Sequence, residues 1–474
     1  MKLPESRPNV LILMPDELRA DALGYAGHPV FRTPHIDRLA HEGVSFTRAY
    51  CASPLCMPAR ASMISGLAPH NHHVQDNAGR LPEDDETFAQ LLQRVGYHTA
   101  AIGKLHFWPD DPGRSFVEHE PYVHARGFAD VHEIPGPASL TKTDSYLSRR
   151  WRDLGLLDAY RADFRRRQEA SRAGDAAAWA SPLPVAEYAD SYVGARAVEW
   201  LERYESNVPS LLHVSFGGPH PPFDAPEPYA SLYAPEALPD PVPPSAPDAW
   251  APSRVRDRML AGRTPLSATD AARVARERMA NYGGKIALID EWIGRILHTL
   301  DARGLTDQTL VIFLSDHGEM GGDHGRFNKS VFYEGAARIP LVLRWPGAIP
   351  PGRRVDALVE QVNLFATVVA AAGAPPSRRS FACSLLPPAA GATLPAGMAR
   401  DAVFSELKRE VMVRTEQYKY AVDAQGAGYL LFNLEHDPHE QHNLIGHPGA
   451  TTIERDLRER LLTWLVSTQI ERVN

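Results

Sequence analysis

One of the three cysteines of this chain lies in the stretch SPLCMPARASMISG, residues 53–66, where a proline and an arginine follow it at short spacing. Cys56, Pro58 and Arg60 form the pattern Cys-x-Pro-x-Arg. The 474 residues include three cysteines, 41 prolines and 43 arginines, so a chance match has a probability of roughly two per cent. Alone, the pattern only suggests a reactive thiol. A buried cysteine before a helix is the simpler structural interpretation, and the neighbouring motifs must decide.

Two pairs of polar residues follow continuous apolar runs. Asp16 and Glu17 end the stretch NVLILMPDE, and Asp316 and His317 end the stretch TLVIFLSDH. Either pair alone is more often a helix cap or a turn, because Asp is favoured in both places. Two such pairs at strand ends of one sheet, however, can converge on one cation that balances their negative charge. The sequence therefore predicts a metal site with oxygen and imidazole ligands.

Cationic and hydrogen-bonding side chains also follow apolar runs. Lys104 and His106, in GKLHF, are two residues apart, so an extended backbone would point both side chains the same way. A solvated lysine or a surface histidine is the favoured interpretation for either residue in isolation. Together, the chain offers enough donors to hold a tetrahedral oxyanion beside the metal. These donors are Arg60, Asn77, Lys104, His106, His220 and Lys329.

The elements that must position these residues are indicated by apolar runs and helical patterns. Continuous apolar runs, typical of strands buried on both faces, occupy 9–14, 97–103, 211–218, 309–316 and 339–345. Helical patterns between them cover 35–43, 85–96 and 279–304. This alternation predicts an α/β fold with a large, mostly parallel sheet flanked by helices. In such sheets the chemistry collects at the carboxyl ends of the strands.

We expect two domains. Residues 1–375 would form the catalytic α/β domain, and residues 376–474 a smaller C-terminal α+β domain with antiparallel strands and a terminal helix. The segment 134–275, rich in Pro, Ala, Arg and Asp, has weak periodicity and predicts loops and short helices laid over the site.

Composition excludes several classes of partner. The formal net charge of −8 gives no basic surface for nucleic acid. Three cysteines without zinc spacing or a disulfide framework favour a reducing compartment. The apolar run VLILM is shorter than the roughly 7–15 residues of a signal-peptide core, and no run approaches the ~18 apolar residues of a membrane span. We therefore expect a cytoplasmic protein without a membrane partner; its oligomeric state is left open.

Taken together, the motifs resemble the sulfatase family, within the alkaline phosphatase-like superfamily. Residues 56–60 match the family's core Cys-x-Pro-x-Arg signature, and GYHTAAIGKLH, residues 96–106, matches its second signature. The likeness continues through SFGGPHPPF, LSDHGEMGGDHGRFNK, RIPLVLRWPG and the C-terminal LFNLEHDPHEQHNL. It covers most of the chain and leaves roughly 134–190 and 230–275 unmatched.

This resemblance implies a mechanism for hydrolysing a small sulfate ester. A separate maturation enzyme would oxidise Cys56 to formylglycine, whose aldehyde adds water to become a geminal diol. One hydroxyl attacks sulfur and expels the alcohol, and the second then loses its proton, so that the hemiacetal collapses and releases sulfate. Met57 and Ser65 depart from the strict signature that the maturation enzyme reads.

The resemblance also implies roles for individual residues. Arg60 and Lys104 would hold the diol, His106 would be the base for the collapse step, and His220 would protonate the leaving oxygen. Asn77, Lys104, His220 and Lys329 would bind substrate. The metal ligands would be Asp16, the matured Cys56, Asp316 and His317. Glu17 stands where many sulfatases have a second Asp, and its role as a ligand is left open.

His317 replaces an Asn found in many sulfatases. Ca²⁺ is the expected cation, with Mn²⁺ or Mg²⁺ as alternatives, because a nitrogen ligand suits a transition ion. Together with DELRAD and Asn77, His317 resembles the branch that contains phosphonate monoester hydrolases and choline sulfatases. The alternative function is therefore hydrolysis of phosphonate monoesters or phosphodiesters at the same site. A third hypothesis is a non-catalytic binding protein in which Cys56 stays a thiol.

One histidine cluster lies outside this set. PHNHHVQ contains His70, His72 and His73, which we interpret as a loop near the mouth of the site because the cation already has its ligands.

Overall fold

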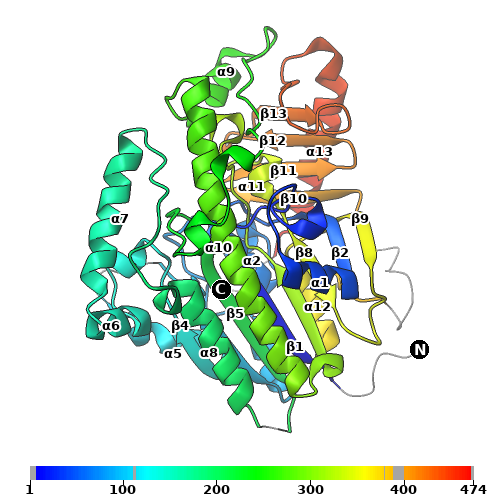
Figure 1. The fold of residues 1–474 in the computed structure, drawn as a ribbon. Coiled ribbons are helices and arrows are strands. Elements are labelled where there is room, and N and C mark those ends of the chain that lie inside the picture. Colours follow the sequence, from blue (N-terminus) through cyan, green and yellow to red (C-terminus); the bar gives the residue numbers. More distant parts are fainter. Residues whose placement is uncertain (1–6, 110–113, 206, 378, 388–399, 471–474) are drawn as a thin grey trace.

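The computed structural model describes residues 7–109, 114–205, 207–377, 379–387 and 400–470. Within them, the main sheet has nine strands in the order β4-β3-β5-β1-β6-β8-β2-β7, and β9 pairs with β2 (Figure 1). Strands β4, β3, β5, β1 and β6 run parallel, whereas β8 is antiparallel to both β6 and β2. The predicted mostly parallel α/β sheet is confirmed.

Four adjacent parallel strands carry the polar residues that the sequence singled out. They are β3 (His98–Gly103), β5 (Ser210–Pro219), β1 (Asn9–Asp16) and β6 (Thr309–Leu314). Because neighbouring parallel strands end at the same edge, the residues that follow them are brought together there. Lys104, His220, Asp16 and Asp316 therefore lie at one edge in that order.

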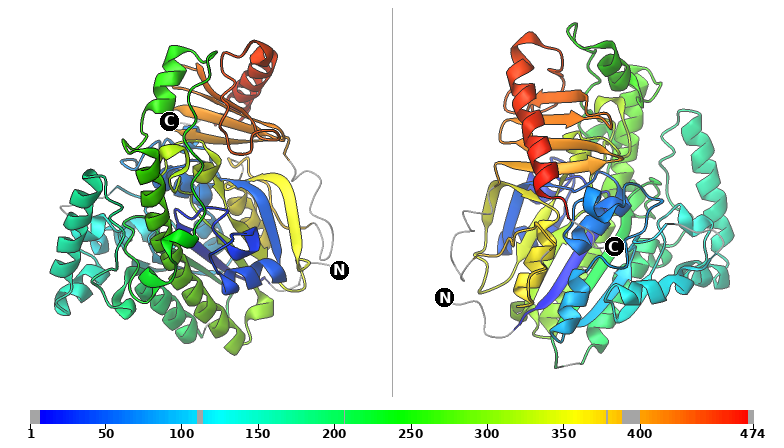
Figure 2. Two further views of the ribbon diagram at one scale, coloured as in Figure 1. Left: turned by 45° about the horizontal axis from the view of Figure 1, so that its top comes forward. Right: turned by 180° about the vertical axis from the view of Figure 1, so that it is seen from behind.

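Two helical layers cover the sheet. On one face, α1 (Pro34–Glu42), α8 (Ala189–Arg203) and α10 (Ala268–Ala302) share an apolar core with the sheet. On the other face, α2 (Cys56–Ser65), α4 (Phe88–Arg94) and α12 (Asn363–Ala371) share a second core. Figure 1 shows α8 and α10 in front of the strands, and the view from behind in Figure 2 brings α12 forward.

A separate antiparallel sheet forms the C-terminal unit, as predicted. Its strands follow chain order and are β10 (Ala402–Leu407), β11 (Glu410–Thr415), β12 (Tyr418–Val422) and β13 (Gly428–Asn433). The helix α13 (Thr451–Ser467) packs on this sheet through Leu457 and Leu461 (Figure 2). The domain boundary at 375/376 stays a prediction.

Several elements differ from the expectation. The segment 134–275 is not only loops and short helices, since it contains the 16-residue α7 (Leu157–Arg172) and the 15-residue α8. The sequence pattern does not indicate α7, because most of its side chains are charged or polar and its apolar side is confined to residues such as Leu157 and Tyr160. Strands of the main sheet that were not predicted are β2 (Val44–Tyr50), β4 (Asp130–Glu133) and β9 (Arg353–Glu360).

The remaining elements are short. Helices are α3 (Pro69–His72), α5 (Glu120–Ala125), α6 (Tyr146–Asp153), α9 (Ser253–Leu260) and α11 (Glu334–Ala337). Strands are β7 (Arg338–Ile339) and β8 (Leu341–Arg344), which divide the single strand expected over 339–345. Across the described ranges, no helix combines the length and apolar character needed to cross a bilayer.

The close approach of β3 and β5 depends on Gly103. Its φ is +102°, and a Cβ there would lie 1.9 Å from the carbonyl oxygen of Ser215. We expect Gly103→Ala to lower the free energy of unfolding by more than about 3 kcal/mol, because the strands must separate. Gly96→Ala is the matched control, since φ is +90° but a Cβ would meet nothing within 4 Å; a loss of about 1 kcal/mol is expected. Equal losses in urea denaturation would contradict this.

Candidate active site

Cys56 is the first residue of α2, and every residue of this helix is buried. Its Sγ lies 3.1 Å from Nε2 of His317 and 3.9 Å from Oδ1 of Asp16. Burial raises the pKa of the thiol, but the positive charges of Lys329 and Lys104 outweigh it and lower the pKa well below its ordinary value. A helix N-terminus also favours negative charge. The surroundings of position 56 thus stabilise a negatively charged group.

Four buried side chains could hold a cation. Asp16, Cys56, Asp316 and His317 each offer a ligand atom, and these atoms all lie within 4.8 Å of one another. Nδ1 of His317 is 3.0 Å from the carbonyl oxygen of Gly318, an arrangement in which Nδ1 donates and Nε2 is left for a metal. Two carboxylates, an imidazole and the side chain at position 56 fit a divalent cation.

Arg60 connects α2 to the ends of the strands through hydrogen bonds. Its Nε donates to Oδ2 of Asp316 at 2.8 Å, and Nη1 donates to Oγ of Ser215 at 2.9 Å and to the carbonyl oxygen of Lys104. Its Nη2 lies 3.7 Å from Oδ2 of Asp16. The guanidinium is fully buried. Most of its donors are therefore engaged in holding α2 against β6, β5 and the residue after β3.

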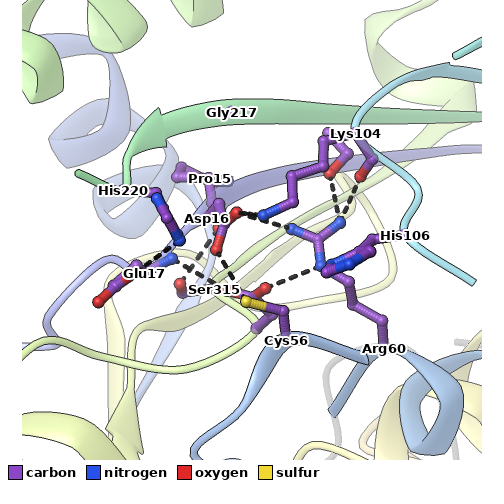
Figure 3. Close-up of polar contacts among 12 residues, drawn as sticks. Pro15, Asp16, Glu17, Cys56, Arg60, Lys104, His106, Gly217, His220 and Ser315 are labelled. Atoms are coloured by element: carbon purple, nitrogen blue, oxygen red, sulfur yellow. Dashed lines mark hydrogen bonds and ion pairs between the residues drawn. The ribbon is translucent and has the colours of Figure 1, made fainter. Parts of the chain in front are cut away.

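Lys104 is ion-paired with Asp16, and both side chains are buried. Burial raises the pKa of Asp16, but the positive charge of Lys104 more than reverses this effect and holds that pKa far below its usual range. Figure 3 shows Asp16 in the middle of the site, with Lys104 and Arg60 approaching from one side and His220 from the other. Asp16 is consequently kept as a carboxylate, the form that a metal requires.

His106 is held by a residue that the sequence analysis did not single out. Its φ is +56°, and its backbone N–H donates to Oε1 of Glu133 at 3.2 Å, while the indole of Trp108 donates to Oε2 at 3.2 Å. Glu133 ends β4, opposite Gly103 in the parallel register. No local motif marks Glu133, because its role depends on pairing between β3 and β4.

A second group of residues lies on the other side of Asp16. Glu17 forms an ion pair with Lys329, and its Oε2 lies 3.3 Å from Nε2 of His220. The backbone N–H of Glu17 donates to Oδ1 of Asp316 at 3.0 Å. Burial raises the pKa of Glu17 well above its ordinary value, and the charge of Lys329 offsets only part of the rise. Among the described residues, the Glu17 carboxylate is outside the group that could hold a metal.

Asn77 and the histidine cluster have contacts around α2. Oδ1 of Asn77 accepts a hydrogen bond from the backbone N–H of Met57 at 3.1 Å, which places Asn77 beside the start of α2. His70 contacts Glu406 of β10 at 2.7 Å, and Nε2 of His72 lies 2.9 Å from Oγ of Ser62. His70 and His72 belong to the short helix α3 rather than to the expected loop. His73 follows that helix in the left-handed conformation, with φ of +61°.

Comparison with known proteins identifies the family of this chain. The model of the sulfatase family matches residues 8–374, and the model described as N-sulphoglucosamine sulphohydrolase, C-terminal, matches residues 322–466. The chain belongs to the sulfatase family. The family expected from the motifs is therefore confirmed.

Individual sulfatases and related structures match nearly the whole chain. A choline-sulfatase of Rhizobium meliloti is 32% identical over 478 residues, covering 95% of this chain and 86% of the relative. An arylsulfatase of Clostridium perfringens is 29% identical over 455 residues, covering 93% of this chain and 90% of the relative. The structure of the phosphonate monoester hydrolase of Agrobacterium radiobacter matches with a TM-score of 0.78 at 28% identity. The match covers 98% of this chain and 96% of the hydrolase chain. These matches confirm the alkaline phosphatase-like fold.

Removing divalent metal should destabilise this sulfatase, because Asp16 and Asp316 would lose the cation that balances them. At a metal concentration about 1,000 times the dissociation constant, binding stabilises the folded state by ~4 kcal/mol. We expect chelation to lower the thermal midpoint and abolish activity. Re-addition of Ca²⁺, Mn²⁺ or Mg²⁺ should restore both, and the size of the rise in the midpoint ranks the ions. Asp316→Ala should show no change on chelation. A wild-type midpoint that does not respond to chelation would refute the site.

Burial raises the pKa of Glu133 to about 8. Between pH 4.5, the ordinary pKa of a glutamate, and about pH 8, the Glu133 carboxyl group therefore keeps its proton in the folded protein and has lost it in the unfolded chain. Stability from this group is present at low pH and is lost as the pH rises through that window. We expect the unfolding free energy of wild type minus that of Glu133→Gln to fall steadily from pH 5 to pH 8. A difference independent of pH would contradict the assignment.

Proposed function

We propose that this sulfatase hydrolyses a small sulfate ester through formylglycine made from Cys56, releasing inorganic sulfate and an alcohol. Sulfuric ester hydrolysis is the activity of the family to which the chain belongs. The observation that carries the detailed proposal is the position of Cys56 Sγ, at a helix N-terminus, 3.1 Å from His317 and among the buried side chains that could hold a metal. Formylglycine at this position would place an oxygen nucleophile beside the cation.

The cation would be held by Asp16, position 56, Asp316 and His317, with Ca²⁺ expected and Mn²⁺ or Mg²⁺ as alternatives. When bound, it supplies Lewis-acid activation of an oxygen nucleophile. Arg60 keeps Asp316 in place, and Lys104 keeps Asp16 ionised.

The substrate would be bound by two lysine side chains that approach it from different sides. Lys104 and Lys329 both lie close enough to lower the pKa of Cys56, so both can neutralise the oxygens of a sulfate attacked from position 56. Asn77 is beside the same helix start. These three residues, with His220, are the proposed substrate-binding residues.

Two histidines would move protons. Burial lowers the pKa of His220, which makes its protonated form a stronger acid toward the leaving oxygen. His106 is the proposed base for the collapse step, because its side chain lies close enough to Cys56 to help lower the pKa of the thiol. Its Nδ1 is buried without a hydrogen-bond partner among the described residues, so this atom is available for a group that arrives with the reaction.

Maturation requires a partner enzyme. Cys56 and Arg60 are at most 1% exposed, so a formylglycine-generating enzyme that reads this motif would act before α2 is buried. We further propose a cytoplasmic location, supported by the three free cysteines. A cytoplasmic sulfatase would favour a small imported ester over an extracellular polysaccharide.

Hydrolysis of phosphonate monoesters or phosphodiesters is the alternative. It is supported by the 28% identity and near-complete overlap with the phosphonate monoester hydrolase of Agrobacterium radiobacter. Sulfate and phosphonate esters are both tetrahedral anions, and the same cations could stabilise either transition state. The family match and the similarity to a choline-sulfatase favour sulfate.

One assay separates the two functions. We expect kcat/KM for an aryl sulfate to exceed that for an aryl phosphonate monoester, measured on one metal-loaded preparation of known aldehyde content. Cys56→Ala should remove activity on both, because nothing else at position 56 can attack. A phosphonate preference would overturn the proposed substrate class, and activity retained in Cys56→Ala would overturn the nucleophile. Peptide mass at position 56 gives the aldehyde content, since the aldehyde is lighter than the thiol.

A further inference from the structure

The turn that carries His220 is held by a buried lysine from a distant helix. Nζ of Lys285, in α10, donates to the carbonyl oxygen of His220 at 2.6 Å and to that of Pro222 at 3.0 Å. Lys285 is 1% exposed. Its carboxylate partner is Asp224, whose Oδ1 lies 3.4 Å from Nζ. A buried ammonium is costly unless its hydrogen bonds are made, and two of those bonds are made to the His220 turn.

The strand end before this turn is held from α8. Oδ1 of Asp190 accepts hydrogen bonds from the backbone N–H groups of Gly217 at 2.8 Å and Gly218 at 2.9 Å. A Cβ on Gly218 would lie 2.4 Å from Oδ2 of Asp190, so the carboxylate lies directly against the strand. Asp224 is itself fixed, because Tyr188 OH donates to its Oδ1 at 2.7 Å. Side chains of two helices, α8 and α10, thus hold the residues around His220 by hydrogen bonds.

The imidazole orientation depends on the part of the turn that Lys285 grips. Nδ1 of His220 lies 2.6 Å from the carbonyl oxygen of Pro221, between the two carbonyls bound by Lys285. If Nδ1 donates to Pro221, Nε2 is the atom left to face the site, where it lies 3.3 Å from Glu17. Figure 3 shows the ring pointing toward Glu17 and Asp16. A shift of the Pro221 carbonyl would turn the ring away.

We propose that Lys285, supported by Asp190 and Asp224, is a positioning residue that aims His220 Nε2 at the leaving oxygen. This inference rests on the proposed role of His220 as the proton donor. Proton donation matters most when the departing alcohol is weakly acidic, and little when a nitrophenolate leaves unaided. Loss of Lys285 should therefore act selectively on esters with poor leaving groups, whereas a general loss of packing would affect all esters alike.

The experiment compares 4-nitrophenyl sulfate with an alkyl sulfate in four matured, metal-loaded proteins. These are wild type, His220→Ala, Lys285→Met and the matched control Lys419→Met. Lys419, in the C-terminal unit, is also buried and is ion-paired at 2.7 Å with Glu334 of α11 and at 2.7 Å with Glu440. We expect His220→Ala and Lys285→Met each to lower kcat/KM for the alkyl ester at least about tenfold more than for the aryl ester. Lys419→Met should change the two esters by the same factor.

The outcomes separate the inference from the function on which it rests. If His220→Ala discriminates between the esters and Lys285→Met does not, the positioning role is wrong and the proton donor stands. If His220→Ala does not discriminate, both are wrong. Should Lys285→Met fail to fold, Tyr188→Phe replaces it, because this change removes only the hydroxyl bonded to Asp224. A selective loss on the alkyl ester supports the inference, and an equal or absent loss overturns it.

Discussion

The ion pairs around Asp16 set the geometry of the whole site. Lys104 and Arg60 lie against this buried carboxylate, and Arg60 also binds Asp316. Charges buried this deeply are tolerated only when opposite charges and hydrogen bonds meet them. The ends of β1, β3 and β6 and the start of α2 must therefore approach one another closely. Cys56 is thus positioned by the same contacts that neutralise Asp16 and Asp316.

Asp16 also divides the site into two regions with different tasks. One region contains Cys56 and the side chains that could hold the cation, and it is shielded by Arg60. The other contains Glu17, His220 and Lys329, whose side chains lie against one another. In the proposed reaction, attack on sulfur and departure of the alcohol occur on opposite sides of a tetrahedral centre, so the two steps would use different proton-transfer residues.

Helices that contribute no reacting group still determine where the reacting groups lie. Cys56, the proposed nucleophile, comes from α2 on one face of the sheet, whereas α8 and α10, on the other face, hold the His220 turn. The strand β4 does the same for His106 through Glu133. Such support is spread over the α/β unit that the sulfatase family model matches, residues 8–374.

The sequence by itself determined the chemical inventory, the family and the strands that end at the site. Apolar runs followed by Asp16, Lys104, His220 or Asp316 report local burial, and short motifs such as Cys-x-Pro-x-Arg are local too. Only the tertiary structure decided which charges meet and what holds the catalytic loops. Glu17 and Asp316 are 299 positions apart, and Lys285 and His220 are 65 apart. Pairings over such separations follow from strand order and helix packing, and no local pattern in the sequence encodes them.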